Sequence, residues 1–164
     1  KALFRILKKR VLILRISNLV GLNKNKSKKL HKTFIDIFYE NIKRGLIFDH
    51  NNEFKDFLSI DKFCEIINRL IVSNAFGTFN VSIGKKIFLK EILSWLNFHN
   101  KKSLKWVKIN KLNKADNFTL NNNKLMNKIS TKNSAKDLKI FCVKLSKVLF
   151  KNNNIKKLLK LIYF

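Results

Sequence analysis

Apolar residues recur along this chain at two spacings, and each change of spacing predicts a new element. Over residues 61–72 they stand three and four positions apart, as on one face of an amphipathic helix. Gly77 interrupts this spacing, and the β-prone run at residues 78–82 then predicts a short strand. The helix face that is expected to be buried comprises Phe63, Ile66, Ile67, Leu70 and Ile71.

The first part of the chain predicts the start of a parallel sheet. Residues 11–14 (VLIL) form a continuous apolar run, which suits a strand buried on both faces of such a sheet. A helix is expected over residues 28–44, closed by Gly45, and a short strand over residues 46–48. The buried face of this helix is expected to comprise Leu30, Phe34, Ile37 and Phe38.

The strand expected at residues 11–14, buried on both faces, predicts a doubly wound α/β core, and further helices and a strand are expected towards the end of the chain. A turn at residues 83–85 leads into a helix, and a strand is expected within residues 104–109. Ser134 is expected to cap a further helix, and a last amphipathic helix is expected over residues 155–162. The inward positions of the two middle helices are Ile92, Leu93 and Leu96, and Leu138, Phe141, Cys142, Leu145 and Leu149.

Codon usage accounts for most of the chain's positive charge. The 164 residues carry a formal net charge of +26, which ordinarily indicates a nucleic-acid or anionic membrane partner. However, lysine supplies 31 of the 36 basic residues, proline is absent, and the abundant residue types are those with A/T-rich codons. Arginine, the better reader of phosphates and guanine, is scarce. We therefore expect no specific nucleic-acid or membrane partner, and keep a small basic nucleic-acid-binding protein as the alternative.

The remaining composition suggests a soluble, cytoplasmic protein with one core. No apolar run approaches the roughly 20 residues of a membrane-spanning helix, and no secretion signal is visible. Cys64 and Cys142 lie far apart, on or beside apolar helix faces, which predicts two small buried hydrophobes and no disulfide framework. His50 and His99 have no Cys, Asp or Glu at a ligand spacing, so no metal site is expected.

Three motifs follow one another in the order used by a known enzyme family. Residues 14–21 (LRISNLVG) match the pattern L-R-x-x-N-x-x-G. Residues 55–61 (KDFLSID) follow in order a segment that reads roughly R-D-F-I-H-V-x-D, one position shorter and with Lys in place of Arg and Ser in place of His. Residues 77–84 (GTFNVSIG) match a G-x-(F/Y)-N-(V/I)-(G/S) strand followed by a glycine turn. The chain thus resembles the extended short-chain dehydrogenase/reductases that act on nucleotide sugars, the NAD-dependent epimerase/dehydratase group.

This resemblance implies the carboxyl-terminal half of such an enzyme. Its fold would be a partial Rossmann-like parallel sheet with a small, helix-rich α/β substrate-binding lobe. Residues 1–22 and 55–98 would supply the late Rossmann-type elements, and residues 23–54 and 99–164 the lobe and closing helices. The cofactor would be NAD or NADP and the substrate a nucleotide sugar, with epimerase, dehydratase and reductase all left open. The family also allows a homodimer of the full-length protein.

The family's catalytic machinery is missing from the sequence. The only glycines, Gly21, Gly45, Gly77 and Gly84, cannot form the G-x-x-G-x-x-G turn that holds a dinucleotide pyrophosphate. The family's Tyr-x-x-x-Lys should precede the strand that ends at the first motif. Tyr39 and Lys43 have the right spacing but follow that motif, so they are interpreted as a rim tyrosine and a solvated lysine. We expect a fragment that is inactive alone and holds no catalytic residue.

The resemblance also assigns binding residues. Asn18 is the best candidate for a substrate contact, because it lies just past the first strand, where open parallel sheets bind ligands. The other interpretation is an ordinary Asn in a strand-end turn. Ser17 and Asn18 would also meet the cofactor, while Lys55 and Ser59 would meet the substrate. Lys55 replaces a family Arg and loses its two-pronged donor, and Ser59 replaces a His and is suited to cap the next helix.

Two aspartates in the second motif have structural interpretations. Asp56 and Asp61 are expected to serve at a turn and in the first turn of a helix, because no second carboxylate is placed for paired acid/base chemistry. A third interpretation of the whole chain is a non-catalytic remnant that pairs with a partner subunit through an exposed sheet edge.

Overall fold

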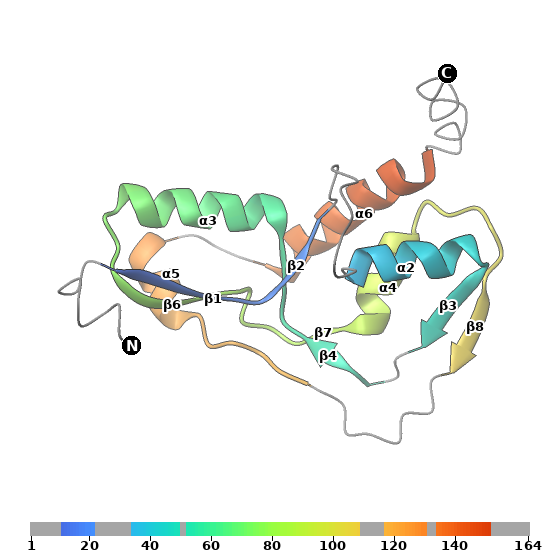
Figure 1. Ribbon diagram of the computed structural model, residues 1–164, viewed down its shortest axis with the longest axis horizontal. Helices are drawn as coiled ribbons and strands as arrows, with labels where there is room; N and C mark the ends of the chain where they lie inside the picture. Colours follow the sequence, from blue (N-terminus) through green and yellow to red (C-terminus); the bar gives the residue numbers. More distant parts are fainter. Residues whose placement is uncertain (1–10, 22–33, 50–51, 109–116, 131–133, 152–164) are drawn as a thin grey trace.

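The computed structural model describes residues 11–21, 34–49, 52–108, 117–130 and 134–151, and they form an α/β fold (Figure 1). The strands are β1 (Leu12–Ile16), β2 (Asn18–Val20), β3 (Leu46–Asp49), β4 (Phe54–Lys55), β5 (Phe57–Ser59), β6 (Gly77–Val81), β7 (Ile87–Phe88) and β8 (Lys105–Lys108). The helices are α2 (Phe34–Lys43), α3 (Ile60–Val72), α4 (Leu89–Asn97), α5 (Asn123–Ile129) and α6 (Ala135–Lys151). The predicted helix over residues 155–162 lies outside the described residues.

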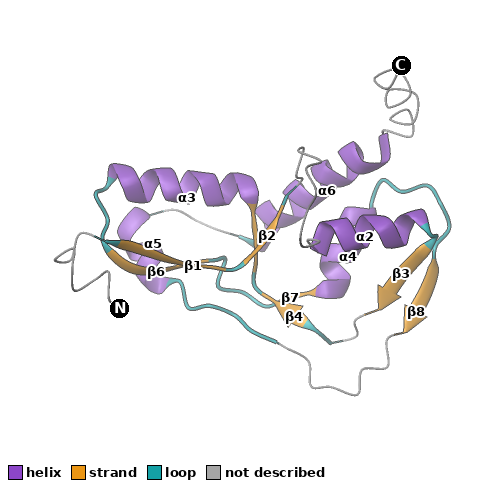
Figure 2. Ribbon diagram, in the orientation of Figure 1, coloured by secondary structure: helices purple, strands orange, loops and turns teal. Residues whose placement is uncertain are grey.

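Most of the strand pairs are parallel, as the sequence predicts. β1 pairs with β6, so that Leu12 lies opposite Gly77 and Ile16 opposite Val81, and the carboxyl ends of the two strands coincide. β2 pairs with β5 and β3 with β8 in the same parallel sense, whereas β4 and β7 are antiparallel. Figure 2 shows the β1–β6 pair at one end of the molecule with α3 and α5, and the β3–β8 pair at the other end with α2.

The core lies where α3, α4 and α6 cover these strands. The predicted inward positions of α4 (Ile92, Leu93 and Leu96) are all buried, and Leu138, Cys142 and Leu145 are buried in α6. α4 and α6 pack against each other, and α5 packs against both β6 and α3. Burial raises the pKa of the Cys142 thiol to about 12, so it is an inert apolar residue at neutral pH. Within the described residues, no helix combines the length and apolar character needed to cross a bilayer.

The predicted face of α3 is right except at Ile71; Phe63 and Ile67 are partly buried, and Phe63 packs against the core. Ile66 and Leu70 are fully buried, but Ile71 is 62% exposed, because it lies about 100° further around the helix than Leu70. Cys64 is exposed, so the prediction of a buried thiol there is wrong. It precedes Ile66 by two residues, which places it about 200° away around the helix.

The predicted face of α2 is displaced by a similar rotation. The buried residues are Ile35, Phe38 and Ile42, whereas Ile37 is 47% exposed and Phe34 is half-buried. The apolar type of Ile37 predicts that it is buried. However, Ile35, Phe38 and Ile42 define the buried face of α2, and Ile37 lies outside that face.

The expected burial of residues 11–14 on both faces is also wrong. These residues are only half-buried, and the following Arg15 and Ile16 are exposed. The reason is that β1 pairs with β6 alone within the described residues, so its second edge has no neighbouring strand there. The parallel pairing of this strand is nevertheless confirmed.

Candidate functional site

The end of β1 is joined to two distant segments by backbone hydrogen bonds. The Ser17 N–H, between β1 and β2, donates to the carbonyl of Val81 at the end of β6, at 3.1 Å. The backbone N–H of Asn18 donates to the Asp56 carbonyl at 3.1 Å, and the Asn18 side-chain Nδ2 donates to the same oxygen at 3.2 Å. We call the resulting arrangement the strand-end corner; it consists of residues 14–21, 55–61 and 77–84.

Asp56 holds this corner together. Its side chain is fully buried; Oδ1 accepts the Ile83 N–H at 3.1 Å, and Oδ2 accepts the N–H groups of Gly84 at 3.0 Å and Leu120 at 3.2 Å. Burial raises the pKa of this carboxyl above its ordinary value, and the hydrogen bonds from Leu120, Ile83 and Gly84 oppose that rise. The buried Asp56 carboxyl group therefore links its own strand region to the turn at Ile83 and Gly84 and to Leu120.

The segment at residues 117–122 closes one side of the corner. Besides the bond to Asp56, the Ser82 hydroxyl donates to the Leu120 carbonyl at 3.3 Å, and Asn122 Nδ2 donates to the Ser82 carbonyl at 2.9 Å. Gly84 has a φ of +73°, and a Cβ there would lie 2.7 Å from Asn122 Oδ1. Glycine is therefore required at this turn for both conformation and space.

Ser17 carries the one buried side-chain polar atom that lacks a hydrogen-bond partner within the described residues. Its side chain is 6% exposed, and no partner is found for Oγ among those residues. Buried hydroxyls are nearly always hydrogen-bonded, so this atom fits a position that meets a polar group from elsewhere. Ser17 is one of the two residues for which a cofactor contact is expected.

Lys55 lies beside Asp56 at the edge of the same corner. It is half-buried in β4 and pairs with Ile87 of β7. Its Nζ lies 5.7 Å from the centre of the Phe118 ring, within cation–π range. The ammonium group of Lys55 therefore lies near the 117–122 segment. Lys55 is also the neighbour in sequence of Asp56, whose carbonyl accepts the hydrogen bonds from Asn18.

Ser59 begins α3, as its sequence position predicts. Its backbone is extended (φ −70°, ψ 147°), and its Oγ accepts the Lys62 N–H at 3.3 Å, so the predicted N-cap is confirmed. Asp61 lies in the first turn of the helix, as expected. The Ser59 side chain is 8% exposed, and its predicted substrate contact stays a prediction, as do those of Asn18 and Lys55.

Removing the cap measures its contribution. We expect Ser59→Ala to lower the free energy of unfolding by about 1 kcal/mol, because one N–H of the first turn of α3 loses its acceptor. Urea denaturation gives this value. Ser94→Ala is the matched control, since Ser94 is exposed inside α4 and Ala favours a helix interior by a few tenths of a kcal/mol. Equal losses in the two variants would refute the cap.

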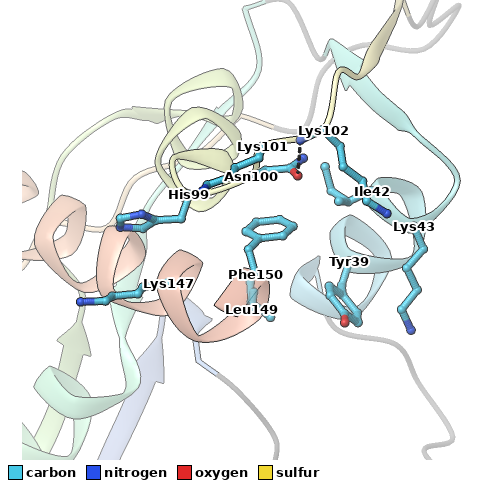
Figure 3. Close-up of a pocket in the computed structure, with 10 residues that line it drawn as sticks. All are labelled: Tyr39, Ile42, Lys43, His99, Asn100, Lys101, Lys102, Lys147, Leu149 and Phe150. Carbon is cyan, nitrogen blue, oxygen red and sulfur yellow. Dashed lines mark hydrogen bonds between the residues drawn. The ribbon is translucent and has the colours of Figure 1, made fainter. Parts of the chain in front are cut away.

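Tyr39 and Lys43 lie on α2 and outside the strand-end corner. Lys43 Nζ is 4.4 Å from the centre of the Tyr39 ring, so the pair forms a cation–π contact within one helix (Figure 3). Tyr39 is half-buried and Lys43 is exposed, which agrees with a rim tyrosine and a solvated lysine. Among the described residues, no group of three or more His, Cys, Asp or Glu side chains is placed to hold a metal ion.

Comparison with solved structures decides the fold. No family model matches the sequence, and no curated protein matches it either. The dTDP-glucose 4,6-dehydratase of Bacillus anthracis, solved with NAD, is 17% identical with a TM-score of 0.66, over 93% of this chain and 49% of that one. This chain shares its fold with about half of that enzyme. The predicted Rossmann-like α/β class is thereby confirmed.

Two further solved epimerase structures are similar to this chain. The ADP-L-glycero-D-manno-heptose-6-epimerase of Helicobacter pylori is 15% identical with a TM-score of 0.68, over 84% of this chain and 44% of that one. The UDP-N-acetylglucosamine 4-epimerase of Methanobrevibacter ruminantium, solved with UDP-N-acetylmuramic acid, is 17% identical with a TM-score of 0.64, over 83% and 44%. This chain therefore spans about half the length of the structures that it matches.

Proposed function

We propose that this chain is the substrate-binding, carboxyl-terminal part of an NAD(P)-dependent enzyme that epimerises, dehydrates or reduces a nucleotide sugar. The observation that carries this proposal is the convergence of the three motifs at the strand-end corner. Residues 18 and 56, which are 38 positions apart, meet through two hydrogen bonds to one carbonyl. The similar structures from Bacillus anthracis and Bordetella bronchiseptica were solved with NAD, and that from Pseudomonas aeruginosa with NADPH.

The residues of the corner have distinct roles in this proposal. The bond from Asn18 Nδ2 to Asp56 fixes the plane of the amide, and Oδ1 is then held as an acceptor for a sugar hydroxyl. Lys55 supplies a positive charge for a diphosphate, as a point charge in place of a two-pronged guanidinium. The Ser17 hydroxyl meets the cofactor, which supplies hydride transfer at a sugar carbon when bound. Asp56 positions Asn18 and touches neither ligand.

The catalytic residues would come from sequence outside this chain. The complete reading frame is therefore expected to encode a G-x-x-G-x-x-G turn and a Tyr-x-x-x-Lys pair ahead of residue 1. A cytoplasmic location and a homodimer of the intact protein stay predictions. A reading frame with neither motif would instead favour a non-catalytic remnant that pairs with a partner subunit.

Asn18→Ala tests the substrate contact in the intact protein. We expect the dissociation constant of the nucleotide sugar to rise about tenfold, since a lost hydrogen bond of about 1.4 kcal/mol has that effect. NAD or NADP should stay largely bound, because Ser17 and the sequence outside this chain still contact it. Calorimetric titration measures both, after a screen of UDP-, dTDP-, GDP- and ADP-sugars for the tightest ligand. Asn127→Ala, in an exposed position of α5, is the matched control, and unchanged sugar-nucleotide binding by Asn18→Ala would contradict the assignment.

A further inference from the structure

A cavity of about 490 Å³ lies apart from the strand-end corner (Figure 3). It opens between the carboxyl end of α2, the turn at residues 99–102 after α4, and the carboxyl end of α6. Its volume is typical of a small-molecule site. Neither Asn18 nor Lys55 lines it, so a ligand there would be independent of the proposed nucleotide-sugar site.

Hydrogen bonds hold the turn over this cavity in place. The His99 N–H donates to the Ser146 hydroxyl at 2.9 Å, and Ser146 is fully buried in α6. Asn100 Nδ2 donates to Asn97 Oδ1 at 2.9 Å, and the Lys102 N–H donates to Asn100 Oδ1 at 3.1 Å. This turn, which forms one part of the rim, is therefore held in place before any ligand binds, and that lowers the entropic cost of binding.

The lining combines an apolar floor with a basic rim. Ile42, Leu149 and Phe150 form the floor, and four lysines with His99 surround it. Figure 3 shows the Phe150 ring at the centre, with His99 and Lys147 on one side and Tyr39 and Lys43 on the other. Among the described residues that line the cavity, none is acidic.

We propose that this cavity binds a small molecule that joins a flat apolar group to a phosphate or carboxylate. The Phe150 face suits stacking of a flat ring, and burial of that ring contributes about 25 cal/mol per Å² of apolar surface. The lysines attract the anion, and the part of the lining that the structure describes holds no competing carboxylate. Charge alone is insufficient evidence in a chain with a net charge of +26, so the apolar floor carries the specificity.

The test is an NMR titration of the intact protein at 0.15 M salt with phenyl phosphate, benzoate and inorganic phosphate. Phenyl phosphate or benzoate should shift resonances of residues 39–43, 99–102 and 147–150, and should bind at least fivefold tighter than inorganic phosphate. The tighter of the two identifies the anionic group. Equal affinity for all three ligands, or shifts confined to other residues, would overturn the proposal.

Substitutions inside and outside the cavity distinguish binding at this site from non-specific attraction of anions by lysines. Phe150→Ala and Lys102→Ala should each weaken binding of phenyl phosphate or benzoate about three- to fivefold. Lys144→Ala removes the same charge from an exposed position of α6 outside the cavity, and should change the affinity less than twofold. If Lys102→Ala and Lys144→Ala weaken binding equally, the proposal is wrong, even if Phe150→Ala fails to fold.

Discussion

Asp56→Ala is expected to lower the free energy of unfolding of the intact protein by about 3–4 kcal/mol. The substitution leaves the N–H groups of Ile83, Gly84 and Leu120 without their acceptor in a buried environment. Each such group costs about 1–3 kcal/mol when it is left unsatisfied, and water entering the space left by the carboxyl offsets part of the sum. Urea denaturation followed by circular dichroism measures the loss.

Asp56→Asn and Asp61→Ala make this result interpretable. Asn keeps one acceptor oxygen but places an NH₂ group opposite a backbone N–H, so we expect an intermediate loss of about 2 kcal/mol. Asp61 is exposed in the first turn of α3, and its loss should cost about 0.5 kcal/mol or less. A loss for Asp56→Ala no larger than that for Asp61→Ala would show that the buried carboxyl does not hold the corner together.

Phe57→Ala is expected to cost about 3–5 kcal/mol of unfolding free energy, the range for a large buried aromatic residue. Phe57 is 2% exposed in β5, lies opposite Asn18 in the strand pairing, and has its ring centre 5.9 Å from that of Phe34. Its removal opens a cavity within the strand-end corner, next to Asn18. Thermal and urea denaturation both report the loss.

Phe98→Ala is the matched control for this substitution. Phe98 is 67% exposed after α4, so its removal takes little surface out of the core and should change stability by about 0.5 kcal/mol or less. If the two phenylalanine variants were equally stable, the placement of β5 in the core would be wrong.

Features that depend on neighbouring residues could be predicted from the sequence. The cap at Ser59 uses an N–H only three positions away, and the centre of the α3 face follows from the helical period. The predicted burial of Cys64 and Ile71 is wrong, because both side chains are exposed. An apolar residue type does not show how far around a helix the core extends. The burial of β1 failed for a related reason, since an apolar run cannot specify how many strands lie beside it.

Features that join distant segments could not be predicted. Asp56 was expected at a turn, but its three donors lie 27, 28 and 64 positions away, and no local pattern marks them. The Asn18 position at a strand end could be inferred, whereas the two bonds to the Asp56 carbonyl could not. The cavity around Phe150 draws on residues near positions 40, 100 and 148, so only the folded chain brings its apolar floor and lysines together.

Binding at the strand-end corner is the central claim, and an NMR titration of the intact protein with UDP, dTDP, GDP and ADP tests it most directly. At least one of these nucleoside diphosphates should shift the Asn18 side-chain amide and the Lys55 backbone amide in a saturable way. No shift at either residue with any of the four, or shifts at residues 99–102 and 147–150 alone, would contradict the account.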